Sequence, residues 1–174
     1  KESCYIAKYS QEGRLLWINP FGSQSYDFAN NIVYAEGHVF ASVFLQGDKI
    51  YHKDGEFPSI GNKEGMLIKF DTNGEYVSHN QFLRGFYFNA IEKVDTMIYA
   101  AFNNEIYKLN FDLETVGNIK FNASQFIRVD DMVNVKDTAV LLTGMFGIDF
   151  IYQDTVLNPA VTGEGYKAFV TSIN

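Results

Sequence analysis

The hydrophobic residues of this chain fall into short segments in which apolar and polar positions nearly alternate, and Gly, Asn or Asp residues separate the segments. Alternation with a period of two is the pattern of a half-buried β-strand, and turn residues between such segments are typical of antiparallel hairpins. We identify no segment with the longer period of an amphipathic helix. The pattern therefore predicts an all-β protein.

One strand and its turn recur along the chain. Residues 5–10 match residues 66–71 at a constant offset of 61 positions, and a turn glycine follows each copy, at Gly13 and at Gly74. The same strand recurs without the glycine at residues 106–110, and in weaker form at residues 169–174. Internal similarity of this kind indicates a repeat architecture, in which each unit packs on its neighbours.

A second repeated unit is a strand, a turn and a strand, found at residues 31–43, 90–102 and 132–143. The first and third copies are 101 positions apart, and this offset continues into the long loop that follows each of them. Four residues recur there, so that Asp48, Ile50, Tyr51 and Pro58 fall on Asp149, Ile151, Tyr152 and Pro159. The loops at residues 46–64 and 147–165 are therefore equivalent parts of two repeats.

Four successive strands can be named a, b, c and d. Residues 31–44 supply strands a and b, residues 65–82 supply c and d, and the cycle then repeats. We predict antiparallel four-stranded blades of a β-propeller, an arrangement that leaves few sheet edges exposed. The predicted single domain spans residues 1–174, with repeat units at 4–64, 65–103 and 104–174.

The order of strands also predicts that the propeller is incomplete. The chain opens with c and d and closes with a, b and c, which amounts to about three to four blades, whereas closed propellers use about 4 to 8. We expect further blades or a partner chain to complete it, with pairing at residues 5–9 or 169–173.

The opening residues are similar to a known repeat. The motifs are Tyr5-Ile6-Ala7-Lys8-Tyr9, Gly13, Leu15-Leu16-Trp17, Phe21-Gly22 and Ala29-Asn30-Asn31-Ile32. They resemble the bacterial β-propeller repeat of the SBBP type, closely over residues 5–43, fairly over 65–77 and poorly in the middle blade. There Tyr76-Val77-Ser78 replaces the Leu-Leu-Trp run, and another propeller subfamily is an alternative. The resemblance implies an exported bacterial protein at the cell surface or in the periplasm.

Charge and cysteine content exclude some classes of function. The formal net charge is -7, from 14 Lys and Arg against 21 Asp and Glu, and such an acidic chain lacks the basic surface that binds nucleic acid or anionic membranes. Cys4 is the single cysteine, so no disulfide can form within the chain and no zinc pattern can be assembled. We find no apolar run of the ~20 residues that a membrane helix needs.

Candidate chemistry is sparse. The spacing of the polar residues and the glycine at residues 71–75 fits a hairpin turn better than a calcium loop. Acidic residues, which we interpret as solvated edges, crowd two regions: Asp48, Asp54, Glu56 and Glu64, and then Asp130, Asp131 and Asp137. The histidines His38, His52 and His79 are scattered and have no metal-ligand spacing. The sequence thus predicts no catalytic residue, no metal ligand and no cofactor, and it leaves the ligand-binding residues unknown.

Three functions are compatible with this pattern. The first is a non-catalytic binding or scaffold module with a protein, peptide or glycan ligand, for example a surface lipoprotein of a nutrient-uptake system. The second is a fragment of a propeller enzyme that acts on glycans, and the third is a purely structural repeat. The long loops, with Tyr51, Phe57, Tyr152 and Pro159, either bind a ligand or cover the edge of a blade.

Two structural expectations follow from the repeat. Equivalent strand positions should be buried between packed sheets, namely Ile32, Val39, Ala41, Val43, Leu67 and Val140. The ring of Trp17 should pack against a neighbouring blade, because a large ring can fill the wedge between twisted sheets, and Trp17→Ala should then cost about 3 to 5 kcal/mol.

Overall fold

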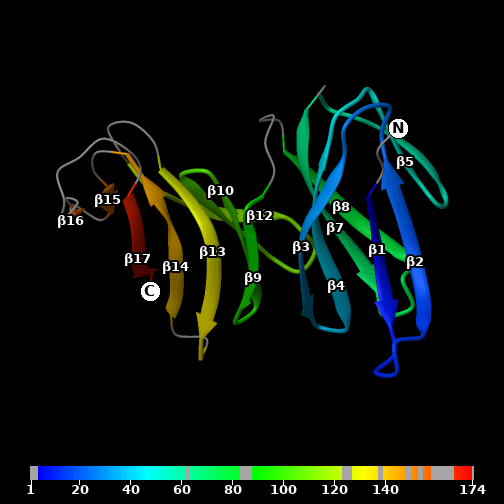
Figure 1. The fold of residues 1–174 in the computed structure, drawn as a ribbon, viewed down its shortest axis with the longest axis horizontal. Helices are drawn as coiled ribbons and strands as arrows, with labels where there is room; N and C mark the ends of the chain where they lie inside the picture. The colour runs from blue at the N-terminus through cyan, green and yellow to red at the C-terminus, as the bar shows by residue number, and fades with distance from the viewer. Residues whose placement is uncertain are drawn as a thin grey trace. The chain divides into compact units, whose positions relative to one another are not determined.

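The structure is a computed structural model that describes residues 4–61, 63–82, 88–122, 127–136, 139–147, 150–152, 155–157 and 167–173. All the secondary-structure elements assigned among these residues are β-strands, which confirms the all-β prediction. This part of the chain contains no helix long and apolar enough to cross a membrane. The chain divides into two compact units, Lys1–Phe88 and Asn89–Asn174, which are described separately below (Figure 1). A single domain over 1–174 stays a prediction.

The first unit contains two antiparallel four-stranded sheets (Figure 1). The first sheet has the order β1-β2-β5-β6, from β1 (Cys4–Tyr9), β2 (Leu15–Gly22), β5 (Lys49–His52) and β6 (Gly55–Pro58). The second sheet has the order β3-β4-β7-β8, from β3 (Phe28–Ala35), β4 (His38–Leu45), β7 (Glu64–Asp71) and β8 (Tyr76–Phe82). The second sheet therefore contains the four predicted strands a, b, c and d in chain order.

The second unit contains a four-stranded sheet, a three-stranded sheet and a small hairpin. The third sheet of the protein runs through β9 (Ala90–Val94), β10 (Met97–Phe102), β11 (Glu105–Leu109) and β12 (Thr115–Lys120) in this order. The fourth sheet has the order β13-β14-β17, from β13 (Ile127–Val135), β14 (Ala139–Phe146) and β17 (Lys167–Ile173). A separate hairpin pairs β15 (Phe150–Tyr152) with β16 (Thr155–Leu157). The predicted sequence of c and d, two full sheets, and a, b and c is confirmed.

The turn between strands c and d has the same backbone in three copies. Its first residue, which is Ser10, Asp71 or Asn110, donates its N–H to the carbonyl oxygen four residues later, at 2.8 to 3.0 Å. Its carbonyl oxygen accepts the N–H of the residue three positions later, at 3.0 to 3.1 Å. The register also shifts after the same lysine in each copy, Lys8, Lys69 and Lys108. The repeat found in the sequence is thus a repeat of hydrogen bonds.

The third copy of this turn differs in one residue. Gly13 and Gly74 have φ of 80° and 84°, a conformation that costs glycine little, whereas the equivalent Leu113 has φ of 65°. The side chain of Leu113 is 2% exposed. Its burial offsets the backbone strain, because fully burying a leucine stabilises by about 1.5–3 kcal/mol and left-handed backbone costs an L-residue roughly 1–2 kcal/mol.

In the first unit, the core lies between the first and second sheets. Ile6 and Phe21 of the first sheet pack with Ile68 and Phe70 of the second, and the rings of Phe21 and Phe70 meet edge to face with centroids 5.4 Å apart. Trp17 and Phe57 are partly buried against this cluster. Alternation places Ile6 and Phe21 on one face of the first sheet, and that face is turned to the second sheet.

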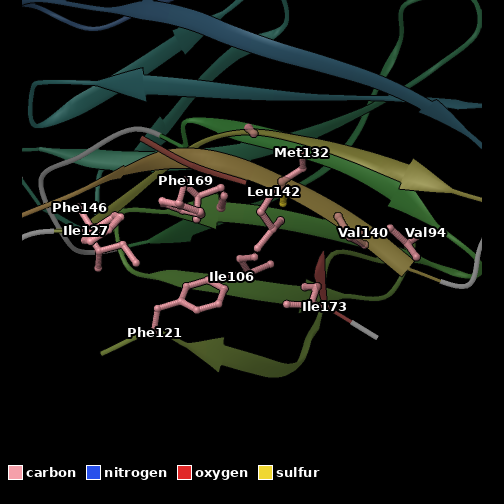
Figure 2. Close-up of a cluster of buried hydrophobic side chains, with 13 residues drawn as sticks. Val94, Ile106, Phe121, Ile127, Met132, Val140, Leu142, Phe146, Phe169 and Ile173 are labelled. Carbon is pink, nitrogen blue, oxygen red and sulfur yellow. The ribbon is translucent and has the colours of Figure 1, made fainter. Parts of the chain in front are cut away.

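The core of the second unit is arranged in the same way. Figure 2 shows the cluster that fills the space between the third and fourth sheets, with Ile106 and Phe121 on one side and Val140, Leu142 and Ile173 on the other. In both units, therefore, the strand-c isoleucine of the earlier sheet, Ile6 or Ile106, faces the sheet that follows.

The burial predictions are confirmed at four of six positions. Ala41, Val43, Leu67 and Val140 are at most 2% exposed. Val39 is only partly buried, and the prediction for Ile32 is wrong, because its side chain is 58% exposed. Ile32 does share a face with its partner Ala41, but it lies on the edge strand β3, where fewer neighbouring strands can cover it.

Candidate functional site

The long loop at residues 46–64 forms a hairpin that extends the first sheet. Strand β5 pairs with the end of β2, through Phe21 with His52 and Gly22 with Tyr51, and Ile50 is fully buried. This geometry favours the interpretation that the loop covers a sheet edge. Of the equivalent loop, Asp149 and Pro159 lie outside the described residues, and Ile151 and Tyr152 lie in β15.

The hairpin also brings together two histidines that are far apart in the sequence. Phe57 of β6 stacks on His79 of β8 with ring centroids 4.3 Å apart, and the His52 ring lies 5.2 Å from that of Phe57 and 5.4 Å from that of Tyr76. All four side chains are partly buried. We call these four residues the aromatic cluster. The scattered histidines of the sequence are therefore neighbours in two of three cases.

Burial determines the favoured protonation state of this cluster. The Tyr76 hydroxyl lies 2.6 Å from Nδ1 of His79. Burial lowers the pKa of His79, and the nearby His52 lowers it further, since two positive rings would repel each other. Burial also raises the pKa of Tyr76. The neutral imidazole is thus the favoured form, and in that form Nδ1 can accept the hydroxyl proton.

Acidification is expected to destabilise the first unit through His79. The pKa of His79 is lower in the folded chain than its ordinary value near 6.5, so the unfolded chain takes up the proton first as pH falls. The free energy of unfolding should hold steady above about pH 6.5 and fall as pH drops through the folded pKa. Urea melts at a series of pH values measure this loss.

The matched variants are His79→Gln and His38→Gln, since His38 lies in a turn with Nδ1 at 2.7 Å from the carbonyl oxygen of Glu36. His79→Gln should flatten the acid limb of the profile below about pH 6.5, and His38→Gln should leave it unchanged. An equal loss of slope in both variants would contradict the role of the aromatic cluster.

Ion pairs surround the hairpin but lie at the surface. Lys49 contacts Glu56 at 2.6 Å, and Lys53 contacts Glu75 at 2.8 Å. All four side chains are at least 37% exposed, and exposed pairs typically contribute about 0–1 kcal/mol. These contacts position the hairpin weakly, so its attachment depends on Ile50 and on the aromatic cluster.

Glu64 is the one acidic residue of this loop that is buried. Its side chain is fully covered, Oε2 accepts the N–H of Ile60 at 3.2 Å, and Oε1 has no hydrogen-bond partner. Burial raises the pKa of this carboxyl, although bonds from Ser59 and Ile60 oppose the shift. Protonation of the Glu64 carboxyl is therefore more favourable than protonation of an exposed glutamate.

Glu64→Gln is expected to stabilise the protein at neutral pH. A raised folded pKa contributes stability below the ordinary value of 4.5, and this contribution is lost as pH rises through the folded pKa. The neutral amide avoids the loss, so the gain at pH 7 should be about 1 kcal/mol and should vanish near pH 4. Thermal melts at both pH values measure it. Glu56→Gln, at an exposed pair, should change stability by less than about 0.5 kcal/mol.

A small groove lies between the first and second sheets. It has a volume of about 210 Å³ and is lined by residues 5–7 of β1, residues 29–32 of β3 and Ala41 of β4. The amides of Asn30 and Asn31 both donate to the carbonyl oxygen of Phe88, at 3.2 and 3.3 Å, which holds this part of β3 in place. The exposed Ile32 therefore belongs to a partly apolar groove.

The other candidate residues of the sequence have structural roles. Asp71 Oδ1 accepts the N–H groups of Asn73 and Glu75 at 2.8 Å, and these bonds lower its pKa, so it forms the predicted hairpin turn. Asp130 pairs with Arg128 at 2.5 Å, and Asp131 accepts the N–H of Met132. Asp137 lies outside the described residues.

Sequence reasoning missed a buried pair between β2 and β3. Asp27 accepts the N–H of Ser23 at 2.6 Å, its hydroxyl at 2.5 Å and the N–H of Gln46 at 3.2 Å, and both Ser23 and Asp27 are at most 5% exposed. Burial and the nearby Asp27 raise the pKa of the Cys4 thiol to about 12, so this thiol is unreactive in the folded chain. A Ser and an Asp four positions apart carry little signal in a sequence without further context.

Among the described residues, no three His, Cys, Asp or Glu side chains gather where they could ligate a metal ion. No model of a known protein family matches the chain, and no curated protein matches it.

Proposed function

We propose that the chain is a set of β-propeller blades that serves as a non-catalytic binding or scaffold module. The observation that carries this proposal is the repeated sheet, because the second and third sheets each run a, b, c and d in chain order. Radial repetition of such sheets is how a propeller is built. The shared turn and the shared register shift after Lys8, Lys69 and Lys108 support a common blade structure.

The binding role is assigned to the groove between β1 and β3. Its volume of about 210 Å³ is smaller than the ~300–1,000 Å³ of pockets for drug-sized ligands, so it suits one side chain of a protein or peptide, or one sugar ring. Ile32, which is 58% exposed, supplies apolar surface at the groove. Following the resemblance to the SBBP-type repeat, we place this module in an exported bacterial protein at the cell surface.

The test is a binding screen against glycan and peptide arrays, combined with a reducing-sugar release assay. A binding module should retain a ligand without turnover, and Ile32→Lys should weaken that binding at least about tenfold because it places a charge in the groove. The matched control is Val77→Lys on β8, which is 44% exposed and lies outside the groove. Release of sugar would favour the propeller enzyme, and equal binding by both variants would remove the groove from the proposal.

A further inference from the structure

The first sheet has an apolar face that is turned away from the second sheet. By alternation and register, the part of this face on β1 and β2 carries Tyr5, Tyr9, Leu15, Ile18 and Pro20, and its part on β5 and β6 carries the ion pair of Lys49 and Glu56. Tyr5, Tyr9, Leu15 and Ile18 are 46% to 60% exposed, and none of the five positions is charged. We call these five residues the rear face. Exposed apolar surfaces of this kind mark interaction sites in soluble proteins.

The repeat shows what covers the equivalent face of the second sheet. Tyr5 and Tyr9 are equivalent to Met66 and Phe70 of the second sheet at the offset of 61 positions. Met66 and Phe70 are at most 1% exposed, and they are buried in the core that the first and second sheets share. In the second sheet, Met66 and Phe70 therefore pack on the sheet before it, whereas the equivalent Tyr5 and Tyr9 of the first sheet are exposed.

The fourth sheet exposes the opposite kind of face. Its outer positions include Val133, Leu141 and Val170, which are 53%, 39% and 71% exposed. We call these three residues the front face. In the third sheet, the residues equivalent to Leu141 and Thr143 are Tyr99 and Ala101, and both of these belong to the core shared with the fourth sheet. Positions equivalent to the front face thus pack, in the third sheet, on the sheet that follows it.

We propose that the rear face of one copy of this chain binds the front face of a second copy, so that the chains associate head to tail. Within each unit, the front positions of the earlier sheet pack on the rear positions of the later sheet. The contact would continue the stacking that both units already use. The five rear-face residues contribute no charge to this contact, and Asp131, which pairs with Thr143, lies on the same side of the fourth sheet as the front face.

Light scattering and sedimentation of the full chain test the proposal. The wild-type protein should have a mass of at least about twice the chain mass of 19.8 kDa at micromolar concentrations. Ile18→Glu on the rear face and Val170→Glu on the front face should each weaken association at least about tenfold. An equimolar mixture of the two variants should regain a two-chain complex, because one intact rear face can still meet one intact front face.

Controls separate this contact from other causes. Val77→Glu and Val116→Glu, at 44% and 53% exposed sites outside both faces, should associate as the wild type does. Ile18→Thr and Val170→Thr keep β-branched side chains, so they serve if the glutamate variants fail to fold, which circular dichroism reports. A monomeric wild type, or variants that do not complement each other, would overturn the head-to-tail contact. Neither result would bear on the groove between β1 and β3.

Discussion

Gly74→Ala is expected to destabilise the first unit by about 2–5 kcal/mol. Gly74 has φ of 84°, where an L-residue is strained by roughly 1–2 kcal/mol. A Cβ at this position would also lie 2.6 Å from Cδ2 of the Trp17 ring, and overpacking of this kind typically costs about 1–3 kcal/mol. A denaturant melt of the purified variant measures the sum.

Gly13→Ala is the matched control, because Gly13 occupies the same turn with φ of 80° and a Cβ there would meet nothing within 4 Å. Gly13→Ala should lower the free energy of unfolding only by the backbone strain, which is about 1–2 kcal/mol. Equal losses in the two variants would show that the ring of Trp17 moves aside without cost.

Trp17 accounts for the difference between the two turns. Its Nε1 donates to the carbonyl oxygen of Thr72 at 3.1 Å, and the amide of Asn19 donates to the carbonyl oxygen of Gly74. The ring thus packs on the turn of the neighbouring sheet, as the sequence predicted, but it is only partly buried. We therefore expect Trp17→Ala to cost about 3 kcal/mol, at the low end of the range for tryptophan. In that background, Gly74→Ala should cost no more than Gly13→Ala.

Asp27→Ala is expected to cost about 3 kcal/mol or more. The change leaves the N–H groups of Ser23 and Gln46 and the Ser23 hydroxyl without their carboxylate acceptor, at a site where Asp27 is 5% exposed. Each buried donor left unpaired costs about 1–3 kcal/mol, although water entering the site recovers part of this. Chemical denaturation with fluorescence of Trp17 as the probe measures the change.

Asp71→Ala is the matched control for Asp27. Asp71 also accepts two backbone N–H groups at 2.8 Å, but in an exposed turn where water can replace the carboxylate. Its loss should be about 1 kcal/mol. If Asp27→Ala and Asp71→Ala lower the free energy of unfolding equally, burial does not explain the importance of the Asp27 site.

The local structure of this protein was predictable from its sequence. Strand type followed from alternation, and the paired assignments of residues 31–44 and 65–82 to one sheet are confirmed by β3, β4, β7 and β8. The turn at Gly13 and Gly74 was also predictable, because only glycine adopts positive φ cheaply. Leu113 was not, since its strained backbone is compensated by burial that no local pattern reveals.

The candidate site was less predictable than the strands. The sequence identified the loop with Phe57 but treated His52 and His79 as unrelated, and they meet only because the hairpin of β5 and β6 lies beside β8. The sequence did not identify Asp27, and the interpretation of Glu64 as a solvated residue is wrong because its side chain is buried. The roles of both residues depend on which main-chain groups surround them. Such contacts join residues that are distant in sequence or fixed by a loop conformation.

The sequence by itself therefore determined the strands, their turns and their order within each sheet, because alternation, turn residues and short hairpin connections are local properties. The tertiary structure alone decided how completely each position on the inward face is covered. Ile32 is exposed although its repeat position suggested a core residue, because its strand lies at a sheet edge. It also decided the contact of Trp17 with Gly74 and the meeting of His52 with His79, since burial and long-range contact depend on how whole sheets stack.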